Sequence, residues 1–254
     1  MNRYFDKITS LLRNVKSAIR FKLINFLSLE HGIMFKTANL IAAEKVEGDY
    51  LEFGVYSGGS FIEAFNTLKH AFGPFQKIHG ERTKEDVKEL NRLWSNMRFF
   101  AFDSFEGLPN LEGIDKHGKD FTKGKYYCSE KDFLKNLEKA GVAMEKVNIV
   151  AGLFEKTCGN ETIEKYSIKK AAVVHIDCDL YLSTKTALNF ITPLLTDGTI
   201  IIFDDWFCFR GNPNLGEQRA FFEWQKETPD WFFIEYQRTG PWTNSFIATK
   251  RTLN

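Results

Sequence analysis

The chain has 254 residues, of which 43% are hydrophobic and 26% are charged, and its formal net charge is +1. This composition is typical of a folded globular protein and excludes a disordered or collagen-like chain. The near-neutral charge argues against a protein that binds nucleic acid through a large basic surface. No apolar run approaches the roughly 18 residues of a transmembrane helix, and we find no secretory signal at the N-terminus. Four cysteines lie far apart in the sequence, so we expect free thiols in a reducing cytoplasm.

Residues 1–32 are expected to form a helical extension, with one amphipathic helix over residues 5–26. Apolar side chains recur there at spacings of three and four, from Phe5 to Phe26, and most of the charged positions are basic. We expect this stripe to dock onto the same chain or onto a second subunit, as in a homo-oligomer. Binding to an anionic membrane surface is the alternative.

Strands then alternate with helices in a single domain that is expected to span residues 33–254. The predicted strands are residues 50–55, 98–103, 147–150, 171–176, 199–203, 231–236 and 245–249. The predicted helices are residues 60–71, 84–94, 129–140, 184–195 and 215–226. This alternation predicts a mostly parallel sheet with helices on both faces, and the short turn before the last strand predicts that this strand is antiparallel. Residues 72–97 resemble an insertion, and residues 106–127, which contain several glycines, are expected to form a long loop.

A glycine-rich turn follows the first predicted strand, from Glu52 to Ser60. Glycines let the backbone turn sharply and let a ligand approach closely, and the carboxyl ends of strands are where open α/β sheets bind ligands. The spacing of the glycines in this turn does not match the GxGxxG pattern. Glu52 offers a carboxylate to an amino or hydroxyl group of a ligand. The alternative is that the glycine-rich turn serves only close packing.

Asp103 ends the second predicted strand. In nucleotide-binding α/β sheets an acid at this place accepts hydrogen bonds from ribose hydroxyls. Alternatively, the Asp103 side chain caps the loop that follows.

Two pairs of carboxylates follow two apolar strands. Asp177 and Asp179 come after the fourth predicted strand, and Asp204 and Asp205 come after the fifth. If these strands are neighbours, the four carboxylates meet at one edge of the sheet and repel one another unless a cation neutralises them. Oxygen ligands suit Mg²⁺, Mn²⁺ or Ca²⁺ rather than Zn²⁺, so we expect a divalent metal site. Capping of the following helices is the alternative, and His175 within the fourth strand is expected to be packed or hydrogen-bonded.

These four motifs, in this order, resemble those of the macrocin- and mycinamicin-type sugar O-methyltransferases. They occupy residues 52–59, 103–109, 176–184 and 204–205, and the resemblance extends over residues 33–249. It implies the class I methyltransferase fold, which depends on S-adenosylmethionine (SAM), together with a divalent metal that is usually Mg²⁺. The implied reaction is methyl transfer to a hydroxyl of a sugar or another polyhydroxylated natural product.

The resemblance also implies roles for individual residues. The implied cofactor-binding residues are Glu52, Gly54, Tyr56, Ser57, Gly58 and Ser60 at the methionine end, Asp103 at the ribose, Gly152, Leu153 and Phe154 near the adenine, and Ser104 and Asp177 as further contacts. The implied metal ligands are Asp179, Asp204 and Asp205, and we expect Asp179 also to receive the proton of the acceptor hydroxyl. Trp206, Phe207 and Phe209 are expected either to stack on the acceptor or to pack in the core.

Two other functions stay open on the sequence alone. The pattern Asp177-x-Asp179 also fits a metal-dependent glycosyltransferase that binds a nucleotide-sugar, although such enzymes do not need the turn at residues 52–60. A cofactor-binding module without catalysis is the other alternative, which the metal-binding acids disfavour. In each case the expected partner is a small molecule rather than a nucleic acid or a membrane.

Overall fold

The computed structural model describes residues 32–73, 82–111, 113–117 and 122–251, and the expected N-terminal helix lies outside them. One seven-stranded sheet has the order β3-β2-β1-β4-β5-β7-β6. Its strands are β1 (Asp49–Phe53), β2 (Phe99–Asp103), β3 (Val147–Ala151), β4 (Ala171–Ile176), β5 (Leu195–Phe203), β6 (Trp231–Thr239) and β7 (Thr243–Lys250). The first five run parallel, and β7 pairs antiparallel with both β5 and β6. This confirms the predicted fold class and the antiparallel last strand.

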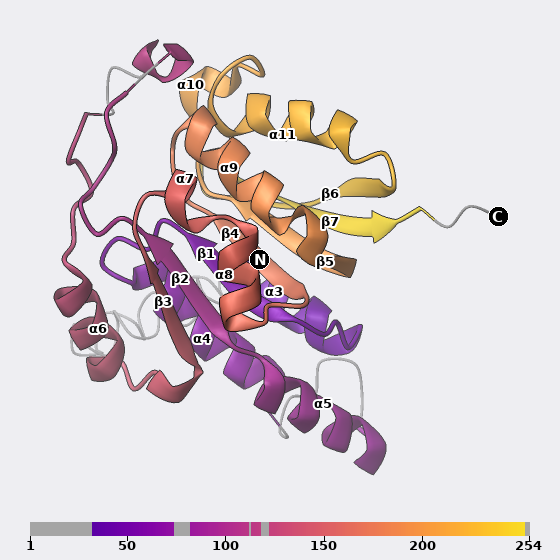
Figure 1. Ribbon diagram of the computed structural model, residues 1–254. Helices are drawn as coiled ribbons and strands as arrows, with labels where there is room; N and C mark the ends of the chain where they lie inside the picture. Colours follow the sequence, from indigo (N-terminus) through magenta and orange to yellow (C-terminus); the bar gives the residue numbers. More distant parts are fainter. Residues whose placement is uncertain (1–31, 74–81, 112, 118–121, 252–254) are drawn as a thin grey trace, which may run out of the picture.

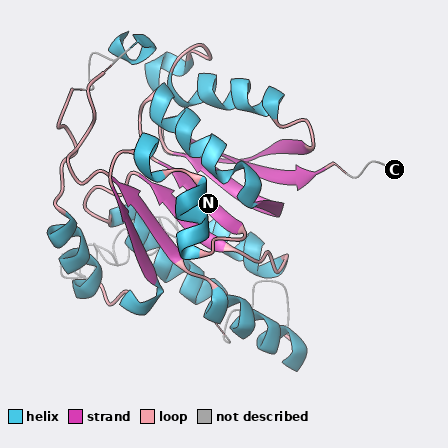
Figure 2. Ribbon diagram, viewed as in Figure 1, coloured by secondary structure: helices cyan, strands magenta, loops and turns pink. Residues whose placement is uncertain are grey.

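Helices cover both faces of the sheet (Figures 1 and 2). The first face packs against α3 (Ile33–Ala43), α4 (Gly59–Ala71), α5 (Lys84–Asn96) and α6 (Glu130–Lys139). The second packs against α7 (Phe154–Thr157), α8 (Asn160–Tyr166), α9 (Tyr181–Ile191) and α11 (Gly216–Glu227). Because successive strand residues point to opposite faces, a sheet covered on both sides needs continuous apolar strands. In β2, for example, Phe99 packs on the first side and Phe100 on the second.

Several elements differ from the sequence-based expectation. The helices α3, α7 and α8 were not predicted, and α9 begins at Tyr181 rather than at residue 184. The earlier start of α9 has a tertiary cause, since the carboxylate of Asp115 accepts hydrogen bonds from the backbone amides of Tyr181 and Leu182. Asp115 belongs to the short 3₁₀ helix η1 (Gly113–His117) within the long loop that follows β2. Within the described residues, no helix has both the length and the apolar character needed to cross a membrane.

Candidate active site

A pocket of about 370 Å³ opens at the carboxyl ends of the parallel strands. Most of the sequence-predicted site residues line it: Gly54, Tyr56, Asp103, Ser104, Gly152, Leu153, Phe154, Asp177, Asp179, Asp204 and Asp205. They come from the segments that follow five different strands. The parallel topology therefore brings together residues that are far apart in the sequence.

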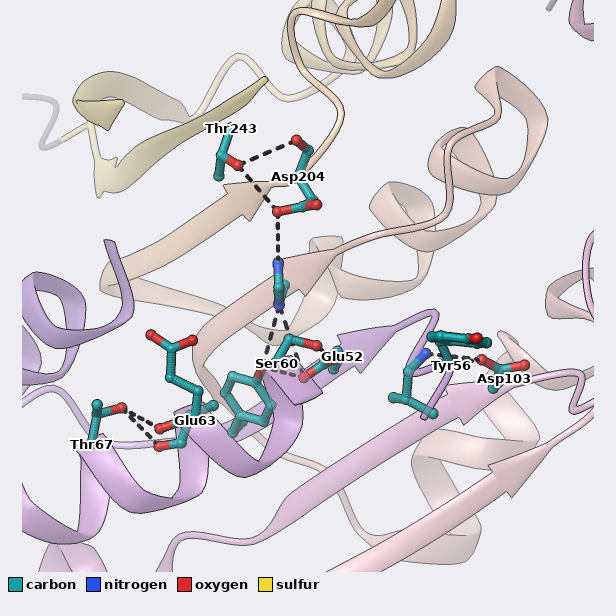
Figure 3. Close-up of polar contacts among 12 residues, drawn as sticks. Glu52, Tyr56, Ser60, Glu63, Thr67, Asp103, Asp204 and Thr243 are labelled. Atoms are coloured by element: carbon teal, nitrogen blue, oxygen red, sulfur yellow. Dashed lines mark hydrogen bonds and ion pairs between the residues drawn. The ribbon is translucent and has the colours of Figure 1, made fainter. Parts of the chain in front are cut away.

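The carboxylate of Asp103 fastens the turn after β1 to the end of β2. Its Oδ2 accepts hydrogen bonds from the backbone amides of Val55 (2.8 Å) and Tyr56 (3.2 Å), and its Oδ1 accepts one from Phe105 (2.8 Å). Figure 3 shows Asp103 beside Tyr56, whose φ of 41° is in the left-handed region that non-glycine residues rarely adopt. Asp103 thus has a structural role in the turn. A carboxylate has about four acceptor positions, so these three hydrogen bonds leave about one, and Asp103 also lines the pocket.

Four predicted cofactor contacts lie outside the pocket lining: Glu52, Ser57, Gly58 and Ser60. Glu52 is fully buried, and its carboxylate accepts hydrogen bonds from the hydroxyl of Tyr50 and from Ser60 Oγ (2.5 Å). The side chains of Glu52 and Ser60 point toward each other rather than into the pocket. Glu52 thus joins β1 to the first turn of α4 (Figure 3).

The four predicted acids meet at one side of the pocket, as expected for neighbouring strands. Burial and the nearby Asp205 carboxylate raise the pKa of Asp179 to about 9. Burial and Asp204 raise the pKa of Asp177 well above its usual range. Burial also acts to raise the pKa of Asp204, but His175 and the Thr243 hydroxyl lower it overall. Repulsion within this cluster therefore favours either retained protons or a bound cation.

The sequence-based reasoning missed Glu217, a fifth acid beside this cluster. It is buried in the first turn of α11, and its Oε2 accepts a hydrogen bond from the backbone amide of Asp205 (3.0 Å). Burial and the charge of Asp205 raise the pKa of Glu217 well above its usual range. No local motif marks this residue, because α11 reaches the site only through the packing of its helix on the sheet.

The metal prediction is not confirmed by the geometry. Among the described residues, no group of three or more His, Cys, Asp or Glu side chains is arranged to hold a metal ion. The chemistry of the acids does fit a hard cation, since they offer only oxygen donors, and burial together with their mutual repulsion raises the pKa of Asp179. The metal therefore stays a prediction.

Exposed aromatic side chains line the pocket at Tyr56, Tyr126 and Trp242. Of the two roles that the sequence left open for Trp206, the structure shows core packing, because its ring is only 5% exposed and packs against Phe203 and Phe246. Trp242 occupies the corresponding place at the pocket, on the turn between β6 and β7. Sequence spacing gave no signal for it.

The macrocin-O-methyltransferase (TylF) family model matches residues 90–220, just over half of the chain. The chain belongs to this family. The matched region holds Asp103, Asp177, Asp179, Asp204 and Asp205, and it begins after the glycine-rich turn.

Two curated relatives are O-methyltransferases by name, and the name of the first includes a rhamnosyl group. The chain is 29% identical over 172 residues to the 8-demethyl-8-(2,3-dimethoxy-α-L-rhamnosyl)-tetracenomycin-C 4'-O-methyltransferase of Streptomyces olivaceus. It is 27% identical over 169 residues to the mycinamicin III 3''-O-methyltransferase of Micromonospora griseorubida. These alignments cover 65% and 63% of this chain, but the chain spans only 56% of the length of either relative.

A solved structure has the same fold. The O-methyltransferase from Bacillus cereus in complex with SAH superimposes with a TM-score of 0.54 at 15% sequence identity, covering 98% of this chain and 97% of that one. Together with the strand order, this likeness identifies the sheet as the class I methyltransferase fold.

Proposed function

We propose that the protein is a SAM-dependent O-methyltransferase that acts on a hydroxyl of a sugar or another polyhydroxylated natural product. The observation that carries this proposal is the pocket itself. It combines the Asp103 turn with the four acids after β4 and β5 in a chain of the macrocin-O-methyltransferase family. The rhamnosyl group in the name of the first relative supports a sugar hydroxyl as the acceptor, and the family match favours methyl transfer over the glycosyltransferase alternative.

The residues divide the pocket into two ends. Gly54, Asp103 and the segment 152–154 form the end proposed for the cofactor, whereas Asp179, Asp204 and Asp205 form the end proposed for the acceptor. Bound SAM supplies a methyl group on a positively charged sulfur. With SAM bound, the pocket would hold the acceptor hydroxyl against that methyl group for transfer from sulfur to oxygen, and a carboxylate of the acceptor end would receive the hydroxyl proton.

Asp179 is the proposed proton acceptor. Because a pKa of about 9 leaves this carboxyl protonated at neutral pH, it would accept the proton only in its ionised form, which a bound cation or a pH near 9 favours. Its φ of 60° holds the residue in a left-handed conformation at the pocket, and such strain is often found at functional sites. A divalent cation on Asp179, Asp204 and Asp205 would offset the repulsion among the acids and lower the pKa of the acceptor hydroxyl.

Binding and transfer experiments test this proposal. Isothermal titration of the full chain with S-adenosylhomocysteine, NAD and UDP-glucose should show binding of the first alone. Tritiated SAM should then label 4-nitrophenyl α-L-rhamnopyranoside or another glycoside in a panel, and Asp179→Asn should lower kcat by about 100-fold or more without loss of cofactor binding. Binding of UDP-glucose in place of S-adenosylhomocysteine would favour the glycosyltransferase.

A further inference from the structure

A line of buried polar groups runs beneath the pocket across three neighbouring strands. Glu52 in β1 is paired in register with His175 in β4, and β4 pairs with β5, after which Asp204 follows. His175 Nδ1 lies 3.9 Å from Glu52 Oε2, and His175 Nε2 lies 3.9 Å from Asp204 Oδ1. The imidazole therefore stands between a buried carboxylate on one side and a pocket carboxylate on the other. Figure 3 shows Glu52 and Asp204 at the two ends of this line.

Only the Asp204 end of the line reaches solvent. The side chains of Glu52 and His175 are 0% and 6% exposed, whereas that of Asp204 is 45% exposed and lines the pocket. Every residue of β4 is buried, and all the others in this strand are apolar. Burial of an imidazole is unfavourable unless charged or hydrogen-bonding partners compensate for the lost hydration. An apolar residue would suit the core equally well, so the contact of His175 with Asp204 is the feature that needs an explanation.

One oxygen of Asp204 has a polar neighbour on each side, Thr243 within hydrogen-bonding distance and His175 Nε2 at 3.9 Å. Thr243 Oγ1 donates a hydrogen bond to Oδ1 (3.1 Å), which is also the atom that faces His175. The backbone amide of Asp204 donates to the carbonyl of Ile176 at the end of β4 (3.0 Å). These contacts involve Oδ1, and Asp204 itself lines the pocket, so we infer that Oδ2 is the oxygen that is available to a ligand there.

We propose that His175 is a positioning residue, which fixes the rotamer of Asp204 so that its free oxygen faces the acceptor end of the pocket. Glu52, held by Tyr50 and Ser60, fixes the ring from behind. The role in catalysis rests on the proposed function, because it requires that Asp204 act on the acceptor. The geometric part, that His175 sets the orientation of Asp204, does not depend on that function.

Two substitutions of His175 distinguish the contributions of its two ring nitrogens. In His175→Gln the side-chain amide nitrogen lies near the place of Nε2 and still faces Asp204. In His175→Asn the amide nitrogen lies near the place of Nδ1 and faces Glu52 instead. His175→Leu matches the other apolar residues of β4 and provides a variant without any donor in case the Asn variant does not fold.

Crystal structures, titration with S-adenosylhomocysteine and methyl-transfer kinetics with 4-nitrophenyl α-L-rhamnopyranoside test the proposal on these variants. We expect Asp204 to keep its rotamer in the Gln variant and to lose it in the Asn and Leu variants. The affinity for S-adenosylhomocysteine should stay unchanged in all of them. Loss of a residue that orients a functional group typically lowers activity about 10- to 100-fold, so kcat should fall by this factor in the Asn and Leu variants, with the KM for SAM unchanged.

The outcomes distinguish the failure of this inference from that of the proposed function. An unchanged Asp204 rotamer in the Leu variant, or equal loss of kcat in the Gln and Leu variants, would overturn the positioning role. If the wild-type protein binds S-adenosylhomocysteine but methylates no glycoside, the acceptor class is wrong, and the rotamers in the crystal structures still decide the role of His175.

Discussion

Gly54 and Asp177 approach so closely that no side chain fits between them. A Cβ atom placed on Gly54 would lie 1.9 Å from the backbone carbonyl oxygen of Asp177, and the φ of Gly54 is 87°. The ends of β1 and β4 therefore meet at the floor of the pocket only because residue 54 is a glycine.

Gly54→Ala should accordingly destabilise the protein. Both the clash and the left-handed backbone oppose the substitution, and we expect a loss of more than about 3 kcal/mol in the free energy of unfolding, measured by urea denaturation. Gly59→Ala is the matched control, because a Cβ atom there meets no heavy atom within 4 Å. Similar losses in both variants would contradict the close approach as the cause.

Asp115→Ala should loosen the long loop that borders the pocket. The carboxylate of Asp115 accepts hydrogen bonds from the amides of Tyr181 (2.8 Å) and Leu182 (3.2 Å), and α9 has no side-chain cap of its own from Leu180. Loss of such a cap typically costs about 1 kcal/mol, and trypsin should then cleave faster at Lys123 and Lys125. Asp115→Asn keeps one acceptor oxygen and should have a smaller effect. An unchanged cleavage rate in the Ala variant would show that the loop is held elsewhere.

Asp179→Asn should stabilise the protein while it removes activity. The pKa of Asp179 is raised to about 9 in the folded protein, whereas the pKa of an aspartate in the unfolded chain is about 3.9. Between these values the folded state retains a proton that the unfolded state has lost, so this group lowers stability progressively as the pH rises through that window. The advantage of the Asn variant in free energy of unfolding should therefore grow by roughly 1 kcal/mol or more from pH 5 to pH 8 in EDTA.

The exposed Asp230 provides the control for this pH dependence. Asp230→Asn should leave the stability profile unchanged, since its side chain is open to solvent. A stability difference between Asp179→Asn and the wild type that does not vary with pH would rule out the buried acid as its source.

Divalent cations should stabilise the wild-type protein through the acidic cluster. A ligand that binds only the folded state raises stability in proportion to the logarithm of its concentration above Kd. Mg²⁺ should thus raise the Tm of the wild type but not that of Asp205→Asn, with NaCl at matched ionic strength as the control. Equal shifts in both proteins, or with NaCl, would indicate general screening of charge rather than a metal site.

The sequence by itself determined the succession of strands and helices along the chain and most of the residues of the pocket. Gly54 and Asp204 directly follow apolar strands, Asp103 ends one, and Asp179 lies three residues beyond another. Parallel strands bring their carboxyl ends to one edge of the sheet, so these residues meet at the pocket. Such positions are recognisable because local hydrophobic patterning marks where a strand ends.

Only the tertiary structure decided how these side chains are used. Whether Glu52 faces a ligand or a neighbour depends on the pairing of β1 with β4, which places it against His175 rather than in the pocket. The choice between Trp206 and Trp242 as the aromatic residue at the pocket depends on how the β6–β7 hairpin packs beside β5. Local sequence patterns report burial along one element, whereas contacts between distant segments follow from the packing of the whole sheet and its helices.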